Sequence, residues 1–194
     1  MSWKRIALAS ILTVGLNGAT YAAGALTPPA VPADIEVLGR KLILIGHAVG
    51  TQNYICAPAA TAAGVDWFFT GPQATLTDAG GRQIATHFLS KNPYQFDALQ
   101  ATWQHSTDTS SVWAKKLRGS TDAAYVAADA IEWLLLEMKG AQVGPFGGQK
   151  LATTTLIQRV HTVGGVKPPE GECTVSTLNS RRFVSYEADY YFYE

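Results

Sequence analysis

The end of the chain carries the clearest folding signal, a strict alternation of side-chain types over residues 184–193. Because successive side chains of a strand point to opposite faces, a period of two indicates a β-strand with one apolar face. Such a strand needs further strands of the same chain to cover that face. The apolar face comprises Val184, Tyr186, Ala188, Tyr190 and Phe192, and the polar and tyrosine-rich face comprises Ser185, Glu187, Asp189, Tyr191 and Tyr193.

Earlier segments repeat this pattern at short intervals, with glycines between them. The first predicts one long strand, or two strands joined at Gly46 or Gly50, and the aromatic second one is expected to end at Gly71-Pro72. Strand series of this kind are typical of a mainly β fold, either an antiparallel β-sandwich or a closed barrel. The predicted strands and hairpins cover residues 42–56, 66–70, 74–88 (a hairpin), 101–115 (a hairpin) and 152–163.

One segment departs from the β pattern and predicts a short helical insertion. Residues 120–122 resemble a helix cap, and Gly140 is placed to end a helix near Lys139. The apolar positions at helical spacing, which we expect to pack on the core, are Ala130, Ile131, Trp133, Leu134, Leu135 and Met138. Residues 91–100 show no period and predict a long loop. The glycine-rich residues 144–148 lack the lysine and hydroxyl residue of a phosphate-binding loop and predict a turn.

The composition excludes several classes of protein. Hydrophobic residues make up 47% of the chain, which is too many for a disordered protein. The 15 basic residues balance the 15 acidic ones, so no basic surplus is present to neutralise nucleic-acid phosphates. We therefore expect one globular domain, with a partner other than nucleic acid.

The N-terminus predicts export. Lys4 and Arg5 precede a short apolar run, and small residues follow at positions 22–25, which is typical of a cleaved signal peptide over residues 1–25. Residues 26–34 are rich in proline and predict an extended segment, and residues 35–194 form the predicted β-rich domain. The apolar run is too short for a transmembrane helix, and no later stretch suits one. The expected location is the periplasm or the medium.

The chain has two cysteines, Cys56 and Cys173. An oxidising compartment favours pairing, and their spacing does not suit a metal site, so we predict a disulfide between them. The alternative is two free thiols with a reactive role.

Motifs along nearly the whole predicted domain resemble one group of exported proteins, domain-of-unknown-function family 3455. The most specific is the ending Tyr-x-Ala-Asp-Tyr-x-Phe-Tyr, which residues 186–193 fill; the others are residues 49–56, Trp67, residues 74–78, His87, Trp103, Asp108 with Ser110, residues 131–136, 157–160 and 162–165, and Cys173. The resemblance implies the fold and export and no particular activity. The chain departs from the family pattern at residues 99–101, Thr109 and Glu132, so a site on that loop is expected to be reshaped.

Four residues are the candidates for a ligand site: His87, Trp103, Asp108 and Ser110. His87 is also the candidate metal ligand, although no histidine pair has a metal-binding spacing. It could act with Asp108, joined by His105 or Glu187, as a ligand set or an acid–base pair, or it could make a structural hydrogen bond beneath the loop. Ser110 lacks the motif of a serine hydrolase.

Two functions remain open from the sequence, and the cofactor and the ligand are unknown. The first is non-catalytic binding of a glycan or another small ligand by aromatic residues, including Trp67, Trp103, Trp113 and the tyrosines of residues 186–193, unless these rings are core. The second is a metal-dependent or acid–base enzyme centred on His87 and residues 91–111. A buried His87 that faces a pocket would favour the enzyme, and an open aromatic face would favour the binding protein.

Overall fold

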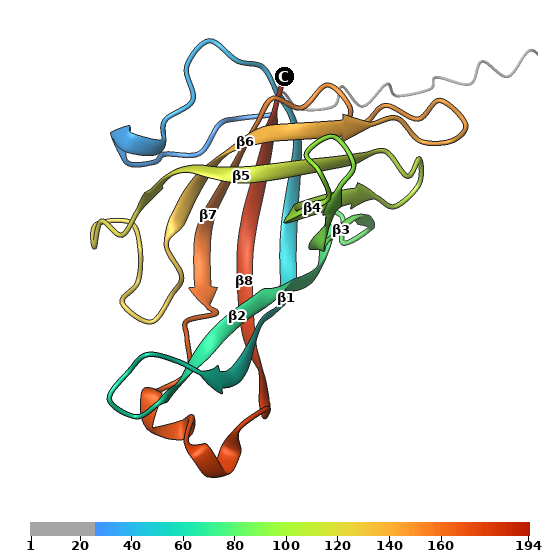
Figure 1. Cartoon of the computed structure of the whole chain (residues 1–194). Helices are drawn as coiled ribbons and strands as arrows, with labels where there is room; N and C mark the ends of the chain where they lie inside the picture. The colour runs from blue at the N-terminus through green and yellow to red at the C-terminus, as the bar shows by residue number, and fades with distance from the viewer. Residues whose placement is uncertain (1–25) are drawn as a thin grey trace, which may run out of the picture.

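The computed structural model describes residues 26–194, so the predicted signal peptide lies outside the described residues. Eight antiparallel strands, each paired with the next along the chain, form one closed barrel (Figure 1). The strands are β1 (Leu42–Pro58), β2 (Val65–Thr77), β3 (Gln83–Asn92), β4 (Ala98–His105), β5 (Ser111–Ser120), β6 (Trp133–Gln142), β7 (Leu156–Gly164) and β8 (Arg181–Tyr193). The mainly β prediction is confirmed in its barrel form.

The first and last strands close the barrel. Their register runs from the pair Leu42 and Tyr193 to the pair Ile55 and Arg181. The predicted alternation of β1 is confirmed, because its even-numbered positions from Ala48 to Cys56 are buried apart from Gly50. At Gly50 a Cβ atom would lie 2.1 Å from the Gln73 carbonyl oxygen, so only glycine allows β1 and β2 to approach this closely.

Strand β2 is longer than predicted. The sequence predicted that this strand ends at Gly71-Pro72, but β2 continues through these two residues to Thr77. The pairing with β1 shifts there, because Asn53 lies opposite Gly71 whereas Tyr54 lies opposite Phe69. This leaves an extra residue, a β-bulge that accommodates the glycine and the proline without ending the strand. The β2–β3 hairpin itself is confirmed.

The predicted helix ending near Lys139 is wrong, because residues 133–142 form strand β6. Helices in the described residues are limited to the 3-10 turns η1 (Ala33–Ile35), η2 (Glu170–Glu172) and η3 (Val175–Thr177). Leu134 and Leu136 point into the barrel, whereas Trp133 and Leu135 pack in a second cluster on its outer side. A strand buried on both faces carries a continuous apolar run that resembles a buried helix in sequence.

The long loop predicted over residues 91–100 is also shorter in the structure. A turn over residues 93–97 connects β3 to β4, which begins at Ala98. The second predicted hairpin is confirmed, with Ala101 opposite Ala114 and Gln104 opposite Ser111. Residues 91–111 are therefore mainly strand and two tight turns.

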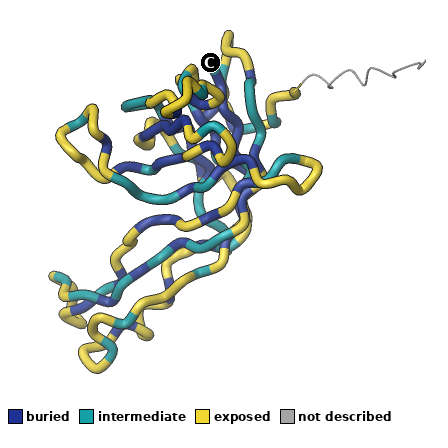
Figure 2. Tube along the Cα trace, turned by 90° about the vertical axis from the view of Figure 1, so that its right-hand side faces the viewer, coloured by how far each residue is buried: buried dark blue, intermediate teal, exposed yellow. Residues whose placement is uncertain are grey.

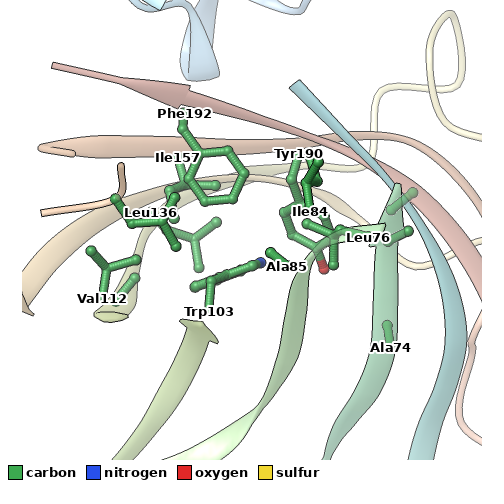
Figure 3. Close-up of a cluster of buried hydrophobic side chains, with 14 of the residues drawn as sticks. Ala74, Leu76, Ile84, Ala85, Trp103, Val112, Leu136, Ile157, Tyr190 and Phe192 are labelled. Carbon is green, nitrogen blue, oxygen red and sulfur yellow. The ribbon is translucent and has the colours of Figure 1, made fainter. Parts of the chain in front are cut away.

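Three apolar clusters hold the barrel together. The largest fills part of its interior and includes Trp103, Tyr190 and Phe192 (Figure 3). The second lies under the N-terminal segment, where Ile35 packs against β6, β7 and β8. The third surrounds the predicted disulfide between Cys56 and Cys173, which is confirmed. Exposed residues gather in the connecting loops (Figure 2). No helix within residues 26–194 has the length and apolar character needed to cross a membrane.

Candidate functional site: the barrel cavity

A cavity of about 520 Å³ extends from the barrel interior to an opening beside β4 and β5. Its inner wall is mostly apolar and includes Leu134 and Leu136. Its opening is lined by the exposed residues Leu99, Lys115 and Lys116. Barrels of eight strands have room for one small ligand when side chains leave part of the interior unfilled.

Three aromatic rings from three strands meet at the inner wall. His87 on β3 lies directly opposite Trp103 on β4, so their side chains share a face. Their ring planes are nearly parallel, 8° apart, with centroids 4.1 Å apart. Tyr190 of β8 meets both rings edge to face, at 5.2 Å from His87 and 5.3 Å from Trp103. The sequence candidates His87 and Trp103 thus form one cluster inside the barrel.

The protonation state of His87 follows from this burial. The side chain is only 4% exposed, and its Nδ1 atom lies 2.9 Å from the carbonyl oxygen of Thr102. Burial lowers the pKa of His87 to about 3, although the Thr102 carbonyl opposes the shift and the nearby Arg159 charge adds to it. The ring is neutral at neutral pH. Since a carbonyl only accepts, Nδ1 carries the proton and Nε2 is left as an acceptor.

Three residues that line the cavity each carry a fully buried polar atom with no hydrogen-bond partner among residues 26–194. These atoms are Gln52 Nε2, Trp103 Nε1 and Arg159 Nε, all buried and all donors. Buried donors without a partner cost about 1 to 3 kcal/mol each, so native proteins rarely leave several of them together. Their concentration at one cavity is the chemical signature of this site.

Arg159 is the charged residue of the inner wall of the cavity. It is half-buried, and its Nη2 atom donates to the Glu132 carbonyl oxygen at 2.8 Å. No carboxylate of the described chain pairs with it, which leaves its charge uncompensated. Burial raises the pKa of Tyr190, and the Arg159 charge opposes the rise without cancelling it. Tyr190 is therefore a neutral hydroxyl beside a cation.

The other two candidates, Asp108 and Ser110, lie in the β4–β5 turn and hold a neighbouring loop. Asp108 accepts hydrogen bonds from the Ser110 hydroxyl at 2.7 Å and from the Lys150 amide at 2.9 Å, and the Ser110 hydroxyl accepts from the Leu151 amide at 3.0 Å. Burial raises the pKa of Asp108, but these hydrogen bonds outweigh it and the net pKa is lowered. The hydrogen bonds give both residues a structural role.

The glycine-rich residues 144–148 form the predicted turn, and the Asp108 contact explains their composition. A Cβ atom at Gly144 would lie 1.8 Å from the Asp108 carbonyl oxygen, and one at Gly148 would lie 2.4 Å from Asp108 Cβ. The glycines therefore let the β6–β7 connection close over Asp108.

The remaining histidine partners are arranged differently from the prediction. His105 Nδ1 lies 3.3 Å from Asp108 Oδ1 in the turn, whereas Glu187 is exposed on the outer face of β8. His47 and His161 contact Asp189 on the same outer face, at 2.6 and 2.8 Å. In the described part of the chain, His, Cys, Asp and Glu side chains form no group of three that could hold a metal ion.

Most of the aromatic residues offered as a binding platform are core. Trp67, Trp113 and Tyr186 are buried, as are Tyr190, Tyr191 and Tyr193. Trp103 is fully buried as well, so the aromatic residues named from the sequence do not form an open face.

Sequence reasoning missed Gln52 and Arg159 as site residues. Both belong to motifs that carried the family resemblance, and Gln52 lies on the buried, even-numbered face of β1. Arg159 lies two residues after Ile157 on β7, so both side chains are on the same face, and Ile157 is buried in the interior. A charged residue at an inward position of an apolar strand is the signal that could have identified it.

Comparisons with known proteins agree with the resemblance seen in the sequence. A family described as "Protein of unknown function (DUF3455)" matches residues 38–194. No curated protein and no solved structure matches the chain significantly. The match spans all eight strands and the residues of the cavity. The chain belongs to domain-of-unknown-function family 3455.

Proposed function

We propose that this chain is an exported, non-catalytic binding protein that holds one small ligand inside its barrel. The observation that carries the proposal is the cavity itself, an apolar interior of about 520 Å³ with a few convergent polar groups. Ligand sites in proteins have this composition and size. An interior site suits a small molecule better than a glycan chain, which needs an open groove.

Export is supported by two observations. The disulfide between Cys56 and Cys173 suits an oxidising compartment. The charged and apolar pattern of residues 1–25 is that of a cleaved signal peptide. The periplasm and the medium both satisfy these observations.

An enzyme centred on His87 is the second candidate, because His87 is buried and lines the cavity, which is the arrangement that the sequence analysis associated with an enzyme. A general base works best when its pKa lies near the working pH, and burial holds the pKa of His87 at about 3. Among the residues that line the cavity, neither aspartate nor glutamate is present to act as its partner. These two points favour binding over catalysis.

The proposal is tested with N-phenylnaphthylamine, a neutral apolar dye that fluoresces when it leaves water. We expect saturable, one-to-one binding to the purified protein. Ala114 is buried at the cavity and Ala98 is exposed at its opening. Ala114→Phe and Ala98→Trp should therefore each weaken binding about tenfold or more, the first by filling the cavity and the second by obstructing the opening.

Ala123→Phe is the matched control, because Ala123 is exposed and does not line the cavity. Circular dichroism reports whether each variant is folded, and Ala98→Trp leaves the core untouched. Absence of saturable binding, or equal binding by all three variants, would contradict an interior site.

The enzyme candidate has a separate test. Metal content of the untagged protein, purified without chelator, is measured by mass spectrometry against protein concentration. A near-stoichiometric transition metal that is lost in His87→Ala would place the enzyme ahead of the binding protein. A metal-free protein that binds the dye would leave His87 as a wall of the ligand site.

A further inference from the structure

We propose that the ligand of the barrel is an amphipathic organic anion. It has an apolar body and a head group with anionic oxygens, and Arg159 binds this head group. The inference rests on the proposed function, since it names the class of ligand for the same cavity. Three observations carry it: the charge of the lining residues, the kind of hydrogen-bonding groups left without partners, and the apolar inner wall.

The charge of the lining has a single sign. Arg159, Lys115 and Lys116 line the cavity and its opening, and acidic side chains are missing from that lining. Lys116 is paired with Glu132 at 2.7 Å. Within residues 26–194, Lys115 and Arg159 have no carboxylate within ion-pair distance. Lys115 lies opposite Glu137 on β6 without an ion pair, so two cations that make no ion pair remain, one at the opening and one inside, although the whole chain has a net charge of zero.

The unpartnered groups are also of one kind. Gln52 Nε2, Trp103 Nε1 and Arg159 Nε are donors, and they come from three different strands, β1, β4 and β7. A ligand that satisfies them must present acceptors. A carboxylate has two oxygens with about four acceptor positions, which is enough for all three donors. A neutral hydrocarbon would leave each of them unsatisfied.

The rest of the wall defines the body of the ligand. Trp103 lies buried in the inner wall, stacked on His87 and in edge contact with Tyr190. Leu134 and Leu136 line the cavity beside it. Rigid aromatic and aliphatic walls of this kind favour an apolar chain or ring. The polar end then meets Arg159, and Lys115 at the opening attracts the anion before it enters.

The experiment compares two dyes that differ only in charge. Anilinonaphthalene sulfonate is N-phenylnaphthylamine with an added sulfonate, so the neutral dye reports the apolar cavity and the anionic dye adds the head group. We expect the anion to bind about tenfold more tightly at low salt, since hydrogen bonds to charged groups are the strong ones. We expect this advantage to shrink as ionic strength rises.

Two variants locate the effect. Arg159→Gln should reduce the affinity for the anion far more than that for the neutral dye. If Arg159→Gln does not fold, Lys115→Gln answers the question, because its exposed side chain lies outside the core. Lys115→Gln should lower the anion affinity about twofold to threefold. Arg118→Gln is the matched control, exposed on the same strand and away from the cavity.

The outcomes separate the two proposals. Equal or tighter binding of the neutral dye would overturn the anion proposal and leave the interior binding site intact. An equal loss in Arg118→Gln and Lys115→Gln would also overturn it, because the anion would then respond to surface charge in general. Failure of both dyes to bind would overturn the proposed function itself.

Discussion

At His87, burial and hydrogen bonding act on the same ring in opposite directions. Removal from water disfavours the imidazolium, while the Thr102 carbonyl favours it, and burial is the larger effect. The stacked Trp103 ring covers one face of the imidazole and makes it part of the cavity wall. His87 is thus built into the core as a neutral aromatic residue with one free acceptor.

Stability should depend on pH through this residue. The unfolded histidine has a pKa near 6.5 and the folded one a pKa of about 3, so the unfolded state takes up the proton first. The part of the free energy of unfolding that depends on neutral His87 is fully present above pH 6.5. It is lost as the pH falls from 6.5 towards 3. As the pH falls from 6.5 to about 4.5, protonation of His87 in the unfolded state should lower the free energy of unfolding by about 2 kcal/mol. Urea denaturation across this range measures the loss.

The comparison for this prediction uses two variants of the same cluster. His87→Gln cannot titrate and should flatten the pH dependence, apart from the part contributed by His105, whose pKa burial also lowers. Trp103→Phe keeps the titrating group and should keep the slope. An unchanged slope in His87→Gln would show that the pKa of His87 is not lowered in the folded state.

Asp108 should contribute to stability through its hydrogen bonds. Asp108→Ala leaves the Lys150 amide and the Ser110 hydroxyl without their acceptor. The expected loss is about 2 to 3 kcal/mol in urea denaturation, the range for hydrogen bonds to a charged group. Asp129→Ala, at an exposed carboxylate, should change stability by less than about 0.5 kcal/mol. Similar values for the two variants would contradict the structural role of Asp108.

At the scale of elements, β6 is the strand that depends on cover from both sides. Leu134→Ala opens the interior and Leu135→Ala opens the outer cluster, and both residues are less than 10% exposed. Each substitution should cost about 2 to 5 kcal/mol. Leu117→Ala on β5, where the side chain is 46% exposed, should cost less than about 0.5 kcal/mol. If Leu135→Ala behaves like Leu117→Ala in urea denaturation, the outer cover of β6 contributes nothing.

The same two-sided burial explains where sequence reasoning failed. Alternation identified β1, β8 and the two hairpins, because each of these has polar residues on at least part of one face. For β6 the outer cover is supplied by residues distant in sequence, such as Ile35, which no local pattern reveals. Asp122 does begin a turn, through its carbonyl and the Tyr125 amide, but the turn is not extended into a helix.

The sequence suggested only some of the residues that line the cavity. His87 and Trp103 were proposed as ligand residues, and their cross-strand pairing brings them together in the cavity lining. Asp108 and Ser110 were grouped with them because they follow closely in sequence, yet their hydrogen bonds go to Lys150 and Leu151. Gln52 and Arg159 reach the cavity from strands far away along the chain, and only the closed barrel shows that they converge.

At the scale of the whole molecule, the disulfide constrains the unfolded chain. Cys56 and Cys173 are 117 residues apart in sequence. Closing a loop of this length should stabilise the fold by about 4 to 5 kcal/mol in the chain-entropy description. Urea denaturation of the Cys56→Ala, Cys173→Ala double variant, compared with the oxidised protein, measures this difference. A loss below about 1 kcal/mol would show that the third apolar cluster holds this end without the bond.

The pairing of β1 with β8 determines when the barrel can form. The interior needs Tyr186, Tyr190 and Phe192, and all three are supplied by the last strand. A chain that emerges from the ribosome N-terminus first cannot complete its interior until Arg181–Tyr193 has followed. Pairing between the two ends is the most non-local contact a chain can make, and such contacts form slowly. The barrel therefore cannot close before its last strand has been synthesised.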